Sequence, residues 1–106
     1  MARVAYLPDA KADLHQIWLF VVQQSQSLDR ADRLIDTIDE TAVKYAAQPK
    51  LGEPRPDLHR DSRCFTVQRF VVFYQPTADG IEVIQIIHGS RDVPKHFRHP
   101  RNKDAD

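Results

Sequence analysis

The chain has 106 residues, of which 42% are hydrophobic and 28% charged, a balance typical of a single soluble globular domain. It contains one cysteine, Cys64, which excludes an internal disulfide and a cysteine-based zinc site and fits a reducing cytosol. No apolar run approaches the ~20 residues of a membrane span, and the first residues lack the apolar core of a signal peptide. We therefore expect a cytoplasmic protein without a metal or a cofactor.

The 15 basic and 15 acidic residues cancel overall but are unevenly distributed. Residues 1–53 hold six Lys or Arg against eight Asp or Glu, whereas residues 54–106 hold nine against seven. Five basic residues and one acid lie between His88 and Lys103. A run of charge is usually a solvated face, and a protein that binds a large polyanion carries a larger overall excess. The pattern therefore favours an acidic protein partner or a confined contact.

The chain begins with the pattern of a short strand followed by a helix. Val4 and Tyr6 alternate with small or polar residues, which predicts a strand in residues 2–6. Pro8 suits the first turn of a helix, and the polar segment Gln23–Ser27 interrupts the helical pattern after about four turns. The apolar residues that recur at three- and four-residue steps are Leu7, Ala10, Leu14, Ile17, Trp18 and Val21.

A second amphipathic helix follows. Ser27 can cap its first turn, and the pattern ends before Pro49. Its apolar stripe consists of Ala31, Leu34, Ile35, Ile38, Ala42 and Tyr45. Because only a few polar residues separate the two helices, they should form an antiparallel hairpin. We expect Trp18 and Tyr45 to belong to the core.

After an irregular, proline-rich connection, Pro49–Pro56, the apolar period changes from 3.6 to 2. Three β-rich runs follow: Arg63–Gln68, Arg69–Gln75 and Ile81–His88. Asp79 and Gly80 form a hairpin turn signal before the last run, and the near-continuous apolar character of the last two runs is typical of central strands. Pro94 suits a short terminal helix. The order β-α-α-β-β-β-(α) predicts an α+β fold in which an N-terminal helical hairpin packs on an antiparallel-dominated sheet.

Several segments also match a known family pattern, in this order and at these spacings. They are DLHQIWLF in the first helix (Asp13–Phe20), QPKLGEPRPDL in the bend (Gln48–Leu58), Arg63 at the start of a strand, VVFYQ (Val71–Gln75) and VIQIIHGSRD (Val83–Asp92). Together they resemble the ParE branch of the ParE/RelE toxin superfamily, the toxic halves of bacterial type II toxin–antitoxin pairs. The resemblance covers about residues 2–98 and implies a single toxin domain in residues 1–98, followed by a polar tail in residues 99–106.

The resemblance implies a partner and two candidate functions. The partner is a ParD-like antitoxin encoded beside the toxin, which binds and neutralises it in a hetero-oligomer. ParE-like members poison DNA gyrase rather than act as enzymes, and this is the function we expect. RelE-like members instead cleave mRNA in the ribosome, and a ribosome-dependent endoribonuclease is the alternative.

RNA cleavage requires a base and several cations that converge on one phosphate. For a nuclease, the candidate residues are Arg63, His88 and Arg91. RelE-like ribonucleases carry more lysine in the bend and an aromatic hydroxyl after the last strand, where this chain has Phe97. This departure counts against a nuclease, and His88 is either an acid–base group or a hydrogen-bonded structural residue. Cys64 has no activating base beside it in sequence, so we expect a small strand residue rather than a nucleophile.

The other role for the basic residues is binding. An acidic antitoxin segment that folds on contact suits a cationic rim beside apolar grooves. Arg91 either belongs to that rim or pairs with a nearby carboxylate, with Asp92 as a helix cap and Gly89 in a turn of positive φ. The candidate residues for binding the target or the antitoxin are Arg55, Arg60, Arg63, Arg69, Arg91, Lys95 and Arg98.

Overall fold

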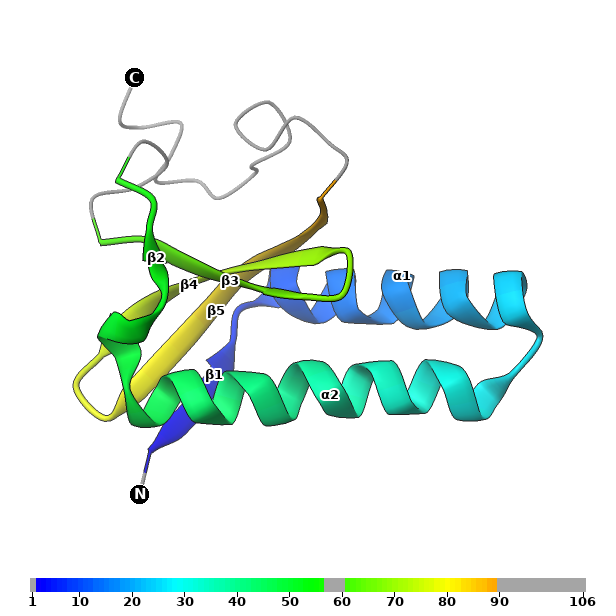
Figure 1. The fold of residues 1–106 in the computed structure, drawn as a ribbon, viewed down its shortest axis with the longest axis horizontal. Coiled ribbons are helices and arrows are strands. Elements are labelled where there is room, and N and C mark those ends of the chain that lie inside the picture. Colours follow the sequence, from blue (N-terminus) through cyan, green and yellow to red (C-terminus); the bar gives the residue numbers. More distant parts are fainter. Residues whose placement is uncertain (1, 57–60, 90–106) are drawn as a thin grey trace.

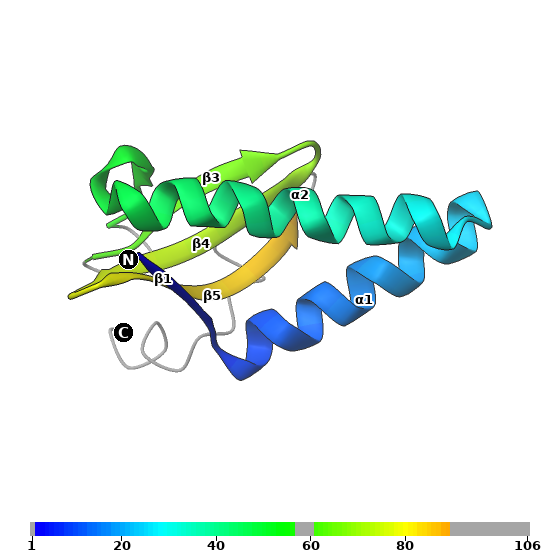
Figure 2. The same cartoon turned by 90° about the horizontal axis from the view of Figure 1, so that it is seen from below.

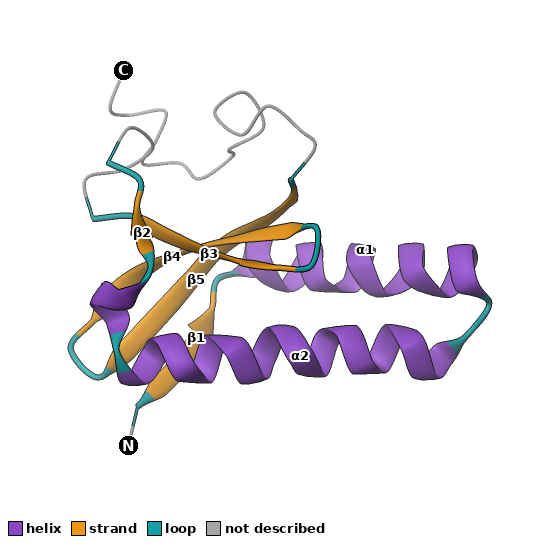
Figure 3. Ribbon diagram, in the orientation of Figure 1, coloured by secondary structure: helices purple, strands orange, loops and turns teal. Residues whose placement is uncertain are grey.

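Two helices packed against one β-sheet form the part of the chain that the structure describes (Figure 1). The computed structural model describes residues 2–56 and 61–89. In chain order its elements are β1 (Arg3–Tyr6), α1 (Pro8–Ser25), α2 (Leu28–Ala47), the 3-10 helix η1 (Pro49–Leu51), β2 (Glu53–Pro54), β3 (Arg63–Val67), β4 (Phe70–Thr77) and β5 (Gly80–His88). The predicted α+β architecture with its N-terminal helical hairpin is confirmed (Figure 3). The expected helix at Pro94 and the polar tail from residue 99 lie outside the described residues.

Within residues 2–56 and 61–89 the sheet is mixed and has five strands in the order β1-β5-β4-β3-β2. β1 runs parallel to β5, and the other neighbouring strands are antiparallel. The two most apolar strands, β4 and β5, are internal to the sheet, as their near-continuous hydrophobic character predicts. The sequence pattern does not predict β2, because its two residues are too few to form a period.

The helices form where the apolar periodicity predicts them, and two polar residues set their junction. Ser27 caps α2 as expected, because its Oγ accepts a hydrogen bond from the backbone N–H of Arg30 at 3.1 Å. α1 runs further into the polar segment than the pattern indicates, since glutamine and serine tolerate the helical conformation. It ends at Ser25 and is capped by Gln26, whose left-handed φ of 54° turns the chain and whose N–H donates to the Val22 carbonyl.

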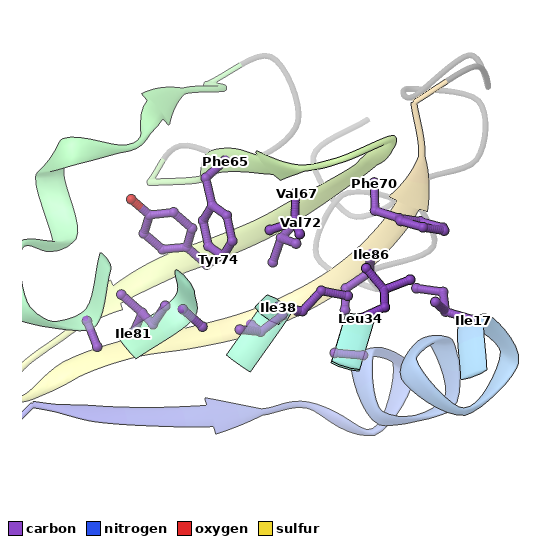
Figure 4. Close-up of a cluster of buried hydrophobic side chains, with 14 residues drawn as sticks. Ile17, Leu34, Ile38, Phe65, Val67, Phe70, Val72, Tyr74, Ile81 and Ile86 are labelled. Carbon is purple, nitrogen blue, oxygen red and sulfur yellow. The ribbon is translucent and has the colours of Figure 1, made fainter. Parts of the chain in front are cut away.

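The main hydrophobic core lies between the helices and one face of the sheet. Both helices contact β5 (Figure 2), and side chains from α1, α2 and the three long strands meet in the interface (Figure 4). Tyr45 packs against this core as predicted, with its ring stacked on Phe65 at a centroid distance of 4.4 Å. Trp18 is only half-buried, and its Nε1–H donates to Asp32 across the hairpin at 2.8 Å.

The opposite face of the sheet is apolar as well. Alternate strand residues point to opposite faces, and a second cluster contains Cys64, Phe73, Ile84 and Ile87. Cys64 is buried in it on β3, which confirms its prediction as a small strand residue.

The hairpin predicted before the last strand is confirmed, but Gly80 and Gly89 do not play the roles that were predicted for them. Gly80 lies after the β4–β5 turn, which consists of residues 78 and 79, and it pairs with Arg3 of β1. A Cβ on Gly80 would overlap the Arg3 carbonyl oxygen, so glycine is needed for the close approach of β1 rather than for turn geometry. Gly89 does not have a positive φ either. The left-handed residue of the sheet is Gln68, with φ of 55°, in the two-residue turn between β3 and β4.

A hydrogen bond ties the edge strand β1 to α2. The Tyr6 hydroxyl donates to Asp39 Oδ1 at 2.6 Å. Burial, and then this hydrogen bond to the negatively charged Asp39, raise the pKa of the Tyr6 phenol above its ordinary value. The hydroxyl therefore stays protonated at neutral pH and holds the strand against the hairpin.

A buried carboxylate from α1 accepts a backbone hydrogen bond from the part of the β5 edge that β1 does not cover. β1 and the backbone N–H of Leu7 cover this edge only as far as Val83. A bulge at Ile84 shifts the alternation of β5, so that Val83 and Ile86 both belong to the core beneath the helices. Asp13 Oδ2 accepts the backbone N–H of Ile86 at 2.9 Å. Asp13 thus satisfies a main-chain donor that would otherwise be buried without a partner.

Candidate functional site

The bend at residues 49–52, the first part of the proline-rich connection, is held by two side chains from the sheet. The Tyr74 hydroxyl donates to the Pro49 carbonyl at 2.7 Å and accepts the Gly52 backbone N–H at 3.0 Å. Arg63 Nη1 donates to the carbonyl oxygens of Lys50 and Gly52 at 2.9 and 2.8 Å. Both side chains therefore bind main-chain groups that lie outside any regular ladder, and they fix the position of the bend.

Gly52 and Tyr74 are matched in shape. A Cβ on residue 52 would overlap the Tyr74 hydroxyl oxygen and lie 2.8 Å from two carbons of its ring. The Tyr74 side chain has no exposed surface into which it could retreat. Burial raises the pKa of the Tyr74 phenol above its ordinary value, so the hydroxyl stays protonated and can donate to Pro49.

A pocket of about 310 Å³ lies beside the bend. Its lining residues are Lys50, Pro54, Pro56, Asp61, Ser62, Arg63 and Pro76. Ser62 is 2% exposed, and its Oγ has no hydrogen-bond partner among the described residues. Two cations, one carboxylate and three prolines suit the recognition of a small polar group better than bond cleavage, because the Asp61 charge opposes the approach of a phosphate.

The other predicted site residues that the structure describes do not line the bend pocket. Arg55 follows β2, and its guanidinium carbon lies 5.9 Å from the Phe73 ring centroid, over the sheet face opposite the helices. Arg69 is exposed in the β3–β4 turn. His88 ends β5 and packs edge-on against Phe70, with ring centroids 5.4 Å apart. The predicted basic site residues that the structure describes are therefore spread over at least three regions of the surface.

Arg63 and His88, two of the three residues proposed for a nuclease, lie well apart along the sheet. Arg63 pairs with Tyr74 of β4, whereas His88 pairs with Phe70. This offset of four residues along β4 corresponds to about 13 Å. The third residue, Arg91, lies outside the described residues, as do Arg60, Lys95 and Arg98.

Sequence reasoning assigned no role to Asp13, Gly52 or Tyr74, although each lies in a segment that carries the family resemblance. One of the three had a usable signal. Asp13 follows Ala10 and precedes Ile17 at helical spacing, so it lies on the apolar stripe, where a carboxylate needs a partner. The fit of Gly52 to Tyr74 depends on the packing of distant segments and has no local signal.

The fold and the bend define a class of small α+β proteins in which a helical hairpin covers a mixed sheet. Within this class, the model for the family described as "ParE toxin of type II toxin-antitoxin system, parDE" matches residues 4–93. The chain belongs to this family.

Individual relatives agree with the family assignment. The chain is 24% identical over 97 residues to "Toxin ParE1" of Mycobacterium tuberculosis, in strains CDC 1551 / Oshkosh and ATCC 25618 / H37Rv, covering 91% of this chain and 98% of the relative. Its fold is similar to a solved structure described as "Chromosomal ParDE TA system from P. aeruginosa", with a TM-score of 0.66 and 23% identity, covering 83% of this chain and 96% of that chain. At this identity the structural similarity supports the fold alone.

In residues 2–56 and 61–89, no group of three or more His, Cys, Asp or Glu side chains is arranged to hold a metal ion. No helix in that part of the chain is long and apolar enough to span a membrane.

Proposed function

We propose that this chain is a toxin that a ParD-like antitoxin neutralises and that inhibits DNA gyrase by binding it. The observation that carries this proposal is the family match over residues 4–93, which covers the described helices and strands except for Arg3 of β1. A gyrase target also agrees with action in the cytoplasm. The ParDE system with a similar fold supports the choice of a ParD-like partner.

The geometry of the bend supports binding over catalysis. Arg63 uses Nη1 to hold two carbonyl oxygens of the bend, so this part of the guanidinium already has partners. His88 is about 13 Å away along the sheet by strand register. An acid–base group must come within hydrogen-bonding reach of the same phosphate that the cations stabilise. Arg63 and His88 do not meet this requirement in the arrangement described, so an endoribonuclease built on them is not favoured.

Expression of the chain alone is expected to stop bacterial growth and induce the DNA-damage response, because a poisoned gyrase leaves DNA breaks. Co-expression with the protein from the neighbouring reading frame should restore growth. Colony counts and a DNA-damage reporter measure the two effects. Unimpaired growth at confirmed high expression would contradict the toxin assignment.

The same experiment separates the two candidate targets. Growth arrest with cleaved mRNA and no induction of the reporter would contradict gyrase inhibition and favour the endoribonuclease.

The negative control for toxicity is the Gly52→Val variant. The valine side chain should prevent correct packing of the bend against the buried Tyr74, so this variant should not stop growth.

A further inference from the structure

The bend pocket contains a buried polar group to which the described residues give no partner. Ser62 is 2% exposed, and its Oγ forms no hydrogen bond within residues 2–56 and 61–89. Buried hydroxyl groups are hydrogen-bonded in the large majority of cases in native proteins, so an exception needs an explanation. Because Ser62 lines the pocket, a molecule bound there is placed to supply the missing partner.

Arg63, which also lines the bend pocket, retains hydrogen-bond donors after it has fixed the bend. A guanidinium group carries five N–H donors, and Nη1 donates to the carbonyl oxygens of Lys50 and Gly52. In the described part of the chain, no hydrogen bond or ion pair uses Nη2 or Nε. Because Nη1 is tied to the bend, the planar group is held in place, and its remaining donors suit a carboxylate.

The charges that line the bend pocket are not compensated by one another. Lys50 and Arg63 contribute two positive charges and Asp61 one negative charge. None of the three forms an ion pair within the residues that the structure describes. A ligand with two anionic groups and one cationic group would therefore give each of these side chains a partner of opposite charge.

The walls of the bend pocket are rigid and apolar. Pro54, Pro56 and Pro76 line it, and the proline ring fixes the backbone φ. The backbone N–H of Arg55 donates to the Ser62 carbonyl at 2.8 Å, which extends the pairing of β2 with β3. A pre-formed site loses less conformational entropy when a ligand binds. The volume of about 310 Å³ lies at the lower limit of small-molecule sites, so the ligand is small.

We propose that the bend pocket binds a free acidic amino acid. Its α-carboxylate binds Arg63 and the Ser62 hydroxyl, its side-chain carboxylate binds Lys50, and its ammonium group binds Asp61. Its single net negative charge neutralises the net positive charge of the pocket lining, and its methylene groups pack against the proline rings. This inference goes beyond the proposed function, because it gives the chain a small-molecule ligand at a surface that gyrase inhibition does not require.

Other ligands match the bend pocket less well. A phosphate group would meet the Asp61 carboxylate without bringing a cation for it. A divalent cation would be repelled by Lys50 and Arg63. The end of a peptide chain carries one carboxylate and a neutral N–H, so it leaves one of the two cations without a partner. A free acidic amino acid satisfies all three charges and the buried hydroxyl.

The test is isothermal titration calorimetry of the purified chain with three compounds at constant ionic strength. L-Glutamate should bind with a dissociation constant of about 1 mM or below, as expected for a ligand of about ten non-hydrogen atoms. Glutarate lacks the ammonium group, and L-glutamine lacks the side-chain carboxylate. Each should bind at least about threefold more weakly than L-glutamate, because each leaves one pocket charge without a partner.

Two substitutions at exposed positions should change the order of these affinities. Asp61→Asn removes the partner of the ammonium group, so glutarate should then bind more tightly than L-glutamate. Lys50→Gln removes the partner of the side-chain carboxylate, so L-glutamine should then bind about as tightly as L-glutamate. A change in preference among ligands cannot arise from partial unfolding, which would weaken the binding of all three equally.

Ser62→Ala separates a ligand-binding role of this residue from a structural one. The substitution removes a buried hydroxyl that has no partner among the described residues, so the urea midpoint should stay the same or rise. The affinity for L-glutamate should nevertheless fall by at least about threefold, because the hydroxyl no longer binds the α-carboxylate. A lower urea midpoint with unchanged affinity would contradict the proposed role.

Matched controls lie on α2 and do not line the bend pocket. Asp36→Asn and Lys44→Gln make the same changes in charge at exposed positions. Both variants should bind L-glutamate within about twofold of the unmodified chain, because solvent and salt screen distant surface charges.

The pattern of affinities decides the proposal. Reversal of the preference by Asp61→Asn, with unchanged binding in the controls, supports it. No binding of L-glutamate at about 20 mM, or equal binding by all variants, overturns the site. Tighter binding of inorganic phosphate, or of a short peptide with a free C-terminus, shows that the proposed ligand is wrong. Growth arrest on expression of the chain is measured separately, so failure here leaves the toxin assignment intact.

Discussion

Asp13→Ala is expected to lower the free energy of unfolding by about 2–4 kcal/mol, which is a large share of the stability of a small domain. The substitution leaves the Ile86 N–H buried without its partner, since Asp13 is only 9% exposed and β1, the described strand on that side of β5, pairs only as far as Val83. It also removes a charge-assisted hydrogen bond, which is stronger than a neutral one. Urea denaturation followed by circular dichroism at neutral pH measures the effect.

Two comparisons separate the hydrogen bond from the loss of a carboxylate as such. Asp13→Asn keeps an acceptor oxygen and should cost about 1 kcal/mol. Asp36→Ala removes an exposed carboxylate from α2 and should change stability by less than about 0.5 kcal/mol. If Asp13→Ala unfolds at the same urea concentration as the unmodified chain, Asp13 does not hold the edge of β5.

Gly52→Ala is expected to destabilise the protein by about 3 kcal/mol. Its backbone φ of −68° is accessible to alanine, so the cost does not come from backbone strain. It comes from overlap of the new Cβ with the buried Tyr74 hydroxyl and ring, which must move and release its hydrogen bonds to the bend. The smaller entropy of the unfolded alanine chain offsets less than about 1 kcal/mol of this loss.

A double-mutant cycle with Tyr74→Phe tests this cause. Tyr74→Phe alone should cost about 1–3 kcal/mol through the lost hydrogen bonds. Because phenylalanine lacks the oxygen nearest to the new Cβ, Gly52→Ala should cost at least about 1 kcal/mol less when it is made in the Tyr74→Phe variant. Additive effects of the two substitutions would show that Gly52 and Tyr74 do not form a matched pair.

The elements with a strong period could be predicted from the sequence. The two helical stripes, the cap at Ser27 and the three long strands are all in place, because burial of an apolar stripe or face determines each of them. The failures are positions where a distant segment decides the conformation. Gly80 belongs to a turn signal in the sequence, but in the structure glycine is needed there because β1 packs closely against it. β1 begins 77 residues earlier, at Arg3.

The site was less predictable than the fold. A charge count selects arginines but does not reveal their partners, so it could not show that Arg63 holds the bend. It also grouped Arg63 with His88, which the strand register separates.

Plasmid supercoiling by purified DNA gyrase is the most direct measurement of whether this chain acts by occupying a target. The unmodified chain should block the introduction of negative supercoils. The inhibitory concentration of the His88→Ala variant should lie within about threefold of that of the unmodified chain, because a residue packed against Phe70 at the end of β5 supplies no proton in a binding mechanism. Undiminished supercoiling at a large molar excess of folded protein would contradict the account.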